Sequence, residues 1–147
     1  MNQTAIPELI EKYWETIPPA WRVTRAVIRS IATEKYNLTV EQFQVLRRIR
    51  RGSTSVSALA EASQTSRSAV SKAVDVLVHK GLITRSQDLD DRRNIPLALT
   101  EEGQNTMAGI YDKTEKWLES LFSRLTVGEL DILLRGMTLL NRIFSQD

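Results

Sequence analysis

The stretch SVSALAEASQTSRSAVSKAVDVLVHKGLITR, residues 55–85, decides the fold of this chain. Ser55 predicts the start of a short helix through residue 62, because a serine hydroxyl accepts a hydrogen bond from the backbone N–H groups that a helix start leaves unpaired. Residues 63–65, Ser-Gln-Thr, then predict a tight turn. The stretch therefore opens with a short helix and reverses direction at once.

A second helix follows this turn, with Ser66 as its cap. Val70, Val74 and Leu77 recur at helical spacing and predict the face that packs on the rest of the protein. Gly81 can adopt the left-handed conformation that ends a helix. Two short helices joined by a tight turn form a helix-turn-helix.

A charged hairpin is predicted directly after Gly81, with strands at residues 82–86 and 95–99. Apolar and other side chains alternate along the second strand, as a half-buried strand requires. Pro96 lacks a backbone N–H and restricts this strand to a sheet edge. The polar loop QDLDDRRN, residues 87–94, joins the strands. The pattern is that of a winged helix-turn-helix, which is mainly α with one small β-hairpin.

Further helices are predicted on both sides of this module. Residues 6–16 predict a helix that Pro18 and Pro19 interrupt, and a second helix runs from residue 20 to about residue 35. A capping box at residues 39–42 opens a helix that ends near Gly52. Thr100 opens a long helix to about residue 124, and a second capping box at residues 126–129 opens the last helix.

Length and composition indicate one ordinary globular domain of 147 residues, with 41% hydrophobic and 26% charged residues. No apolar run approaches the roughly 20 residues that span a bilayer, and no signal peptide is evident. With no cysteine, one histidine and no glycine-rich phosphate loop, the sequence predicts a cytoplasmic protein that is not an enzyme and holds no cofactor. The acidic triplet Asp88, Asp90 and Asp91 lacks EF-hand spacing and adjoins two arginines, so no metal site is expected.

Charge is distributed unevenly along the chain. Residues 39–100 contain ten Lys or Arg against six Asp or Glu, a net charge of +4, whereas the remaining residues carry a net charge of −2. A basic centre between acidic flanks suggests a polyanionic partner, with a solvated charged face as the alternative.

The start of the second helix carries the side chains expected to meet that partner. They are small, polar or cationic, as a helix entering the major groove of double-stranded DNA requires: Ser66, Arg67, Ser68, Ser71 and Lys72. Arg67 can reach a guanine edge with two hydrogen bonds. Ser66 acting only as a cap, and Lys72 contacting only phosphate, are the alternatives. His79 is interpreted as a surface or capping histidine.

Three segments resemble the family of multiple antibiotic resistance regulators, MarR. They are LTVEQFQVL at 38–46, AVSKAVDVLVHKGLI at 69–83, and residues 88–103, which resemble the wing pattern DpxDRRxxxlxLTxxG. The wing pattern matches at Asp88, Asp91, Arg92, Arg93, Leu97, Leu99, Thr100 and Gly103. Leu89 stands where the family usually has proline.

The resemblance implies a role for the wing arginines. Arg93 matches the wing-tip arginine that enters the minor groove, where a narrow A·T-rich groove attracts a guanidinium. Arg92 or Asp91 would hold the shape of the wing, and we count Arg92 with the DNA-binding residues. An exposed Asp91–Arg93 ion pair is the alternative, and it would contribute at most about 1 kcal/mol.

The resemblance also implies a homodimer. Residues 1–37 and 101–147 would be dimerisation helices of a single domain, residues 1–147, and residues 38–100 would be the DNA-binding module. Recognition helices about 34 Å apart would then bind a pseudo-palindromic operator, and the protein is expected to be a transcriptional repressor. Leu133, Met137, Leu140 and Phe144 are expected near the dimer interface.

Family members usually bind a small apolar or aromatic acid that relieves DNA binding. The aromatic walls and cations for such an effector are expected from Tyr13, Trp14, Trp21, Arg22, Arg25 and Tyr36, although the same aromatic residues fit an ordinary core. The alternative function is a winged helix without an effector, which binds DNA constitutively or uses its wing for protein contacts.

Overall fold

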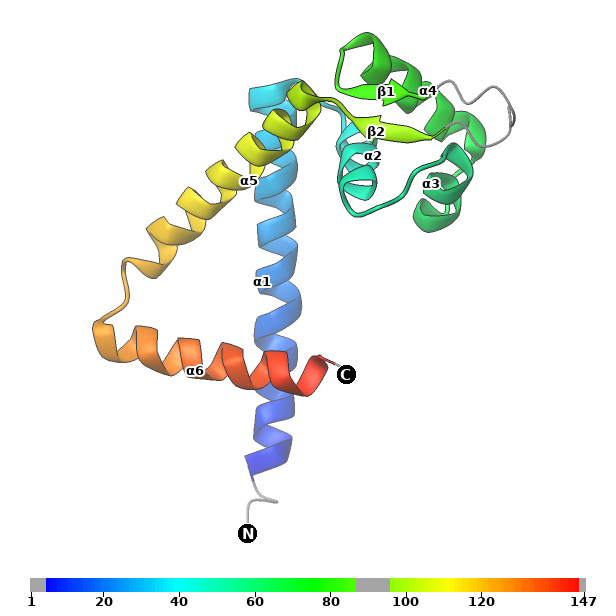
Figure 1. Cartoon of the computed structure of the whole chain (residues 1–147). Coiled ribbons are helices and arrows are strands. Elements are labelled where there is room, and N and C mark those ends of the chain that lie inside the picture. Colours follow the sequence, from blue (N-terminus) through cyan, green and yellow to red (C-terminus); the bar gives the residue numbers. More distant parts are fainter. Residues whose placement is uncertain (1–4, 87–95, 146–147) are drawn as a thin grey trace. The chain divides into compact units, whose positions relative to one another are not determined.

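The computed structural model describes residues 5–86 and 96–145 (Figure 1). Its elements are α1 (Ala5–Tyr36), α2 (Val40–Arg50), α3 (Val56–Ser63), α4 (Arg67–His79), β1 (Ile83–Arg85), β2 (Leu97–Leu99), α5 (Glu101–Phe122) and α6 (Val127–Phe144). The chain forms two compact units, Met1–Asp112 and Lys113–Asp147. The first unit contains the winged helix-turn-helix, which confirms the predicted fold class.

The predicted helix caps are present. The Thr39 hydroxyl accepts from the Gln42 N–H at 3.2 Å, and the Gln42 side chain accepts from the Thr39 N–H at 3.1 Å. Thr126 and Glu129 form the second capping box, in which both of the reciprocal hydrogen bonds are present. Each box pairs backbone donors that the helix itself cannot pair, which explains why these helices start where the sequence predicts.

The predicted helix ends are also confirmed. Gly52 and Gly81 adopt φ values of +111° and +75°, in the left-handed region that a side chain disfavours. Gln64, after α3, reaches the same region at φ +54°, which turns the chain toward α4.

The predicted interruption of the first helix is wrong. α1 continues from Ala5 to Tyr36 with Pro18 and Pro19 inside it. The prolines remove the hydrogen bonds to the carbonyls of Trp14 and Glu15. Both of these residues are exposed, so water can take the place of the missing donors, and long helical segments on either side hold the helix together.

The hairpin is shorter than predicted. β1 and β2 pair antiparallel, with Ile83 opposite Leu99. On its other side, the Leu97 N–H donates to the Thr54 carbonyl at 2.8 Å. The hairpin is therefore anchored to the segment just before α3 as well as paired with itself.

One hydrophobic core holds the first unit together. Its fully buried residues come from α2, α4 and α5, among other elements, and include Leu46, Val74, Leu77, Met107 and Ile110. No helix among the described residues is long and apolar enough to cross a membrane.

The junction between the hairpin and α5 leaves no room for a side chain at Gly103. The Leu82 carbonyl accepts from the Thr100 N–H at 3.0 Å, and it lies only 2.1 Å from the position that a Cβ on Gly103 would occupy. The neighbouring atom belongs to the backbone and cannot rotate away.

We therefore predict that Gly103→Ala lowers the free energy of unfolding by about 1–3 kcal/mol, because a methyl group must displace the backbone of Leu82. Gly128→Ala is the matched control, since no atom lies within 4 Å of its Cβ position. It should be neutral or stabilising by up to about 1 kcal/mol. Urea unfolding followed by circular dichroism measures the free energy of unfolding of both variants. Equal values for Gly103→Ala and Gly128→Ala would contradict the prediction.

Candidate nucleic-acid interface

α4 is held by its buried face and presents the opposite face to solvent. Val70, Ala73, Val74 and Leu77 are buried against the core. At 3.6 residues per turn, Ser68 and Lys72 lie on the opposite side of the helix from Leu77. Packing of the buried stripe therefore determines which side chains α4 presents.

The structure brings the five predicted residues of α4 and its cap together. Ser66, Arg67, Ser68 and Lys72 are exposed, and Ser71 is half-buried. Arg67 lies on one flank of the helix, while Ser68 and Lys72 lie on its outer face. The arrangement combines a planar guanidinium, an ammonium and hydroxyl groups within the first turns of one helix.

Ser66 acts as the helix cap. Its hydroxyl oxygen accepts from the Ala69 N–H at 3.1 Å. The hydroxyl hydrogen is not used by that bond, so a serine cap can still donate to a phosphate or a base. The capping interpretation is thus confirmed, and it is compatible with a DNA contact.

Neither Arg67 nor Lys72 forms an ion pair with a carboxylate in the part of the chain that the structure describes. The acid on the outer face of α4, Asp75, is instead paired with Arg85 of β1. This pair offsets a negative charge on the candidate surface and links the wing strand to α4. Sequence reasoning missed it, because no local spacing rule relates a helix residue to one ten positions later in a strand.

A second tether holds the other end of α4. The Lys80 ammonium donates to the Asn37 carbonyl at 2.7 Å and to the Gln42 side-chain oxygen at 3.4 Å. The end of α4 is thereby joined to the turn between α1 and α2. The two tethers restrict rotation of the helix that carries the candidate residues.

Arg92 and Arg93 lie outside the described residues, as do Asp88, Asp90 and Asp91. The DNA contact of these arginines stays a prediction. Among the described residues, no group of three or more histidine or acidic side chains is placed to hold a metal ion.

The six effector candidates all lie on α1, but the structure does not gather them at one place. From Tyr13 to Tyr36 the helix rises about 35 Å. Tyr13 and Trp14 meet edge-to-face at 5.5 Å, and the Arg25 guanidinium lies 6.0 Å from the Trp21 ring centre. Arg22 is exposed, and Tyr36 packs against the core near Gly109. Within one chain these residues form separate clusters.

Comparison with known proteins agrees with this geometry. The MarR family model matches residues 38–95. An uncharacterised HTH-type transcriptional regulator of Bacillus subtilis, YhbI, is 27% identical over 84% of this chain and 80% of its own length. The HTH-type transcriptional repressor MdtR of the same organism is 42% identical over 48% of this chain and 46% of its own length.

A solved structure shares the fold. The transcriptional regulator Tm0710 from Thermotoga maritima superposes with a TM-score of 0.78 at 22% identity, covering 93% of this chain and 99% of that chain. The class of protein defined by the fold and the exposed face of α4 is a DNA-binding transcriptional regulator, not an enzyme. Over its winged helix-turn-helix module this chain resembles the MarR family.

We predict that the two roles of Ser66 can be separated by substitution. Ser66→Ala should lower the free energy of unfolding by about 1 kcal/mol through loss of the cap. Ser66→Asp should keep the cap and the stability but lower duplex affinity at least about tenfold at low salt, because the carboxylate repels phosphate.

Gln104→Glu adds the same charge at an exposed position in the first turn of α5 and serves as the control. Thermal unfolding and fluorescence anisotropy on labelled duplex DNA measure the two effects. Equal affinity of Ser66→Asp and Gln104→Glu would show that the start of α4 does not face DNA.

Proposed function

We propose that this protein is a repressor that binds a pseudo-palindromic operator as a homodimer, with α4 of each subunit in the major groove. The observation that carries the proposal is the exposed start of α4, where Arg67 and Lys72 lie among serine hydroxyls with no acidic partner among the described residues. The buried stripe and the tethers at Lys80 and Asp75 support it, because base reading requires a helix held at one orientation.

The contacts in this proposal divide into two kinds. Arg67 reads a base edge in the major groove, and Lys72 with the serines positions the helix on phosphates. Arg93 of the wing enters the adjacent minor groove, and Arg92 supports it, as the family resemblance implies. The minor groove separates mainly A·T from G·C, so most of the sequence preference comes from α4.

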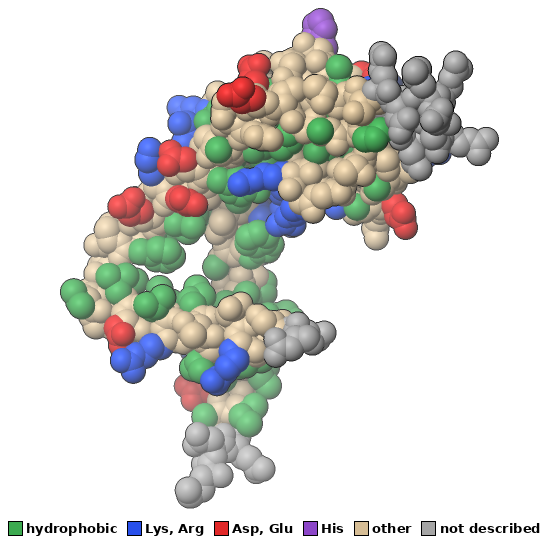
Figure 2. Space-filling model, viewed as in Figure 1, with side chains coloured by type: hydrophobic (Ala, Val, Ile, Leu, Met, Phe, Trp, Pro, Cys, Tyr) green, Lys and Arg blue, Asp and Glu red, His purple; other side chains and the backbone are tan. Residues whose placement is uncertain are grey.

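Exposed apolar surface supports the homodimer. α6 has no buried residue, and most of its apolar side chains are exposed, as the green side chains along it show (Figure 2). The N-terminal half of α1 likewise exposes Ile6, Leu9, Ile10 and Trp14. Monomeric soluble proteins rarely leave continuous apolar surfaces of this kind open to water. Pairing of the terminal helices would cover them and set two copies of α4 about one DNA turn apart.

The repressor role and an effector complete the proposal. MdtR, which is 42% identical to this chain over 71 residues, is named a repressor. A small apolar or aromatic acid relieves repression by binding more tightly to a dimer whose two α4 helices are wrongly spaced for the operator.

We predict that the arginines of α4 and the wing differ in their effect on sequence preference. Arg67→Ala should reduce operator affinity by about 1–3 kcal/mol and relax the preference at one position in each half-site. Arg93→Ala should weaken binding strongly but leave the preferred core sequence unchanged. Lys72→Ala should weaken binding to all sequences and lower the salt slope by about one unit.

Selection of bound duplexes from a random pool, followed by affinity measurements at several salt concentrations, tests these three variants beside the parent. If Arg93→Ala binds as tightly as the parent, the wing does not contact DNA and the protein-contact alternative gains support.

We further predict that Leu133→Glu combined with Met137→Glu converts the dimer to a monomer, since two buried charges would oppose an apolar interface. Thr138→Glu, on the polar side of α6, is the control and should stay dimeric. Multi-angle light scattering at micromolar concentration distinguishes the two states. A monomeric parent protein would disprove the dimer.

A further inference from the structure

The end of α4 is joined to the start of α5 by a single threonine. The Thr100 N–H donates to the Leu82 carbonyl at 3.0 Å, and the Thr100 hydroxyl donates to the Gly81 carbonyl at 2.6 Å. The same hydroxyl accepts from the Gly103 N–H at 2.9 Å and thereby caps α5. Attachment to two successive carbonyls fixes both the position and the direction of α5 at this point, whereas one attachment would leave the helix free to pivot.

Gly103 lets α5 approach this end of α4 more closely than any other residue type would. A Cβ at this position would lie 2.1 Å from the Leu82 carbonyl oxygen, and real Cβ atoms essentially never come within 3.0 Å of another atom. A side chain at Gly103 would therefore displace the start of α5 by about 1 Å. We call Gly81, Leu82, Thr100 and Gly103 the α4–α5 joint.

Further along, α5 is held by the core of the first compact unit. Met107 and Ile110 are fully buried, and the Tyr111 ring centre lies 4.6 Å from the Arg50 guanidinium. At 1.5 Å per residue, these contacts are centred about 8 Å beyond Gly103. A displacement of about 1 Å at the joint would thus tilt α5 by about 7° about its core contacts.

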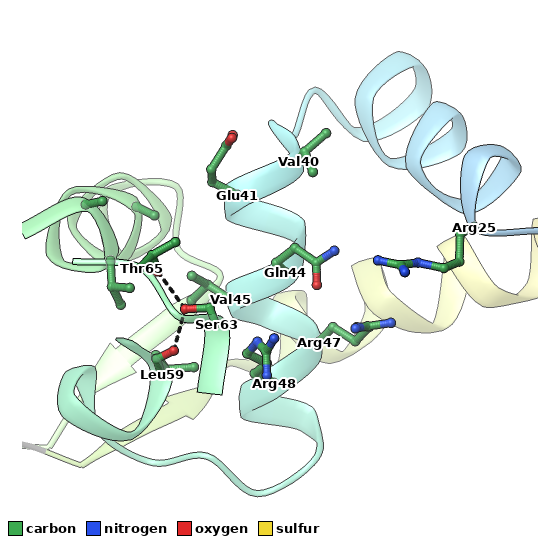
Figure 3. Close-up of a pocket in the computed structure, with 13 residues that line it drawn as sticks. Arg25, Val40, Glu41, Gln44, Val45, Arg47, Arg48, Leu59, Ser63 and Thr65 are labelled. Atoms are coloured by element: carbon green, nitrogen blue, oxygen red, sulfur yellow. Dashed lines mark hydrogen bonds between the residues drawn. The ribbon is translucent and has the colours of Figure 1, made fainter. Parts of the chain in front are cut away.

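Contacts away from the joint leave room for such a tilt. A groove of about 330 Å³ is lined by Arg25 of α1 and by residues of α2, α3 and α4, and Arg25 extends toward Arg47 (Figure 3). Within residues 5–86 and 96–145, neither arginine forms an ion pair with a carboxylate. Burial lowers the pKa of Arg47, and repulsion from Arg51 and Arg25 lowers it further. Charge therefore does not lock α1 and α2 together at this point.

We propose that the α4–α5 joint determines which spacing of the two half-sites the protein accepts, so that Thr100 and Gly103 control specificity without touching DNA. This rests on the proposed function, in which residues 101–147 help to form the dimer. α4 extends about 20 Å from the joint back to Arg67. Relative to the dimer, a tilt of about 7° moves Arg67 by about 2.5 Å, and two subunits together change the separation by up to about 5 Å. Because one base pair adds about 3.4 Å, such a change favours a different spacer.

The first experiment measures affinity for duplexes that carry the two selected half-sites with the selected spacer, or with one base pair more or less. The parent should bind the wrong spacers at least about tenfold more weakly, because misplacing even one base contact costs that much. Thr100→Val removes the hydroxyl but keeps the shape and the backbone hydrogen bond, and it should reduce this discrimination about fivefold. Thr100→Ser keeps the hydroxyl and should match the parent.

Control variants separate positioning from stability. Thr126→Val removes the corresponding cap of α6, so it should lower stability as Thr100→Val does but leave the spacer preference unchanged. Gly103→Ala should shift the preferred spacer, whereas Gly128→Ala, with no atom within 4 Å of its Cβ position, should not. Circular dichroism reports whether each variant folds, and Thr100→Val decides the question even if Gly103→Ala does not fold.

Two outcomes of this experiment would overturn the proposal. One is unchanged spacer discrimination in folded Thr100→Val. The other is an equal loss of discrimination in Thr126→Val, which would reduce the effect to stability. Base preference within each half-site should stay the same in all variants, because none of them alters the exposed face of α4.

The second experiment examines the joint without DNA. The chain has no cysteine, so spin labels can be attached specifically to Ser68→Cys on α4 and Glu115→Cys on α5. Double electron–electron resonance on labelled chains diluted into unlabelled protein measures the distance between the two labels of one chain. Thr100→Val should broaden the distance distribution relative to the parent, while Thr100→Ser and Thr126→Val should not.

The two experiments fail in different ways. Equal distributions in the parent and Thr100→Val would overturn the joint. Failure of the parent to bind any duplex, or equal binding at every spacing, would disprove the proposed function, and the label distances would still decide whether Thr100 fixes the direction of α5.

Discussion

Burial of one face of α4 is the constraint on which the rest of this structure depends. Val74 and Leu77 are completely buried, and with Val70 and Ala73 they fix the rotation of the helix about its own axis. A rotation of one residue position would turn Lys72 and Ser68 by about 100° and place polar side chains in the core. Recognition in this protein is therefore a consequence of packing on the opposite side of the same helix.

The elements around α4 reinforce that orientation by polar contacts at both ends. The Asp75–Arg85 pair links α4 to β1, and Lys80 links its end to the turn after α1. The hairpin is held in turn by Thr54 and by the close approach of Leu82 to Gly103. A change in α1, α2 or α5 thus has a physical route to the recognition helix, which is what regulation by a ligand requires.

Among the described residues, α2 alone holds buried side-chain polar atoms that have no hydrogen-bond partner. Its last turns hold Arg47, Arg48 and Arg50, of which Arg50 stacks on Tyr111 of α5 at 4.6 Å, while the other two leave buried Nε atoms without partners. Buried unpaired donors are uncommon in folded proteins because they reduce stability without compensation.

The sequence by itself determined the order of helices, their starts and most of their ends, because Thr39, Ser55, Ser66 and Thr126 act through contacts within one helical turn. It also determined which residues of α4 face outward, since helical spacing separates them from Val74 and Leu77. It failed at Pro18 and Pro19, because the length of α1 and the access of water to its backbone outweigh the tendency of proline to interrupt a helix. Only the tertiary structure decided that Arg25 of α1 lines the same groove as Arg47 and Arg48 of α2, and that Asp75 of α4 pairs with Arg85 of β1. Those arrangements depend on contacts between elements distant in the chain, which no local spacing encodes.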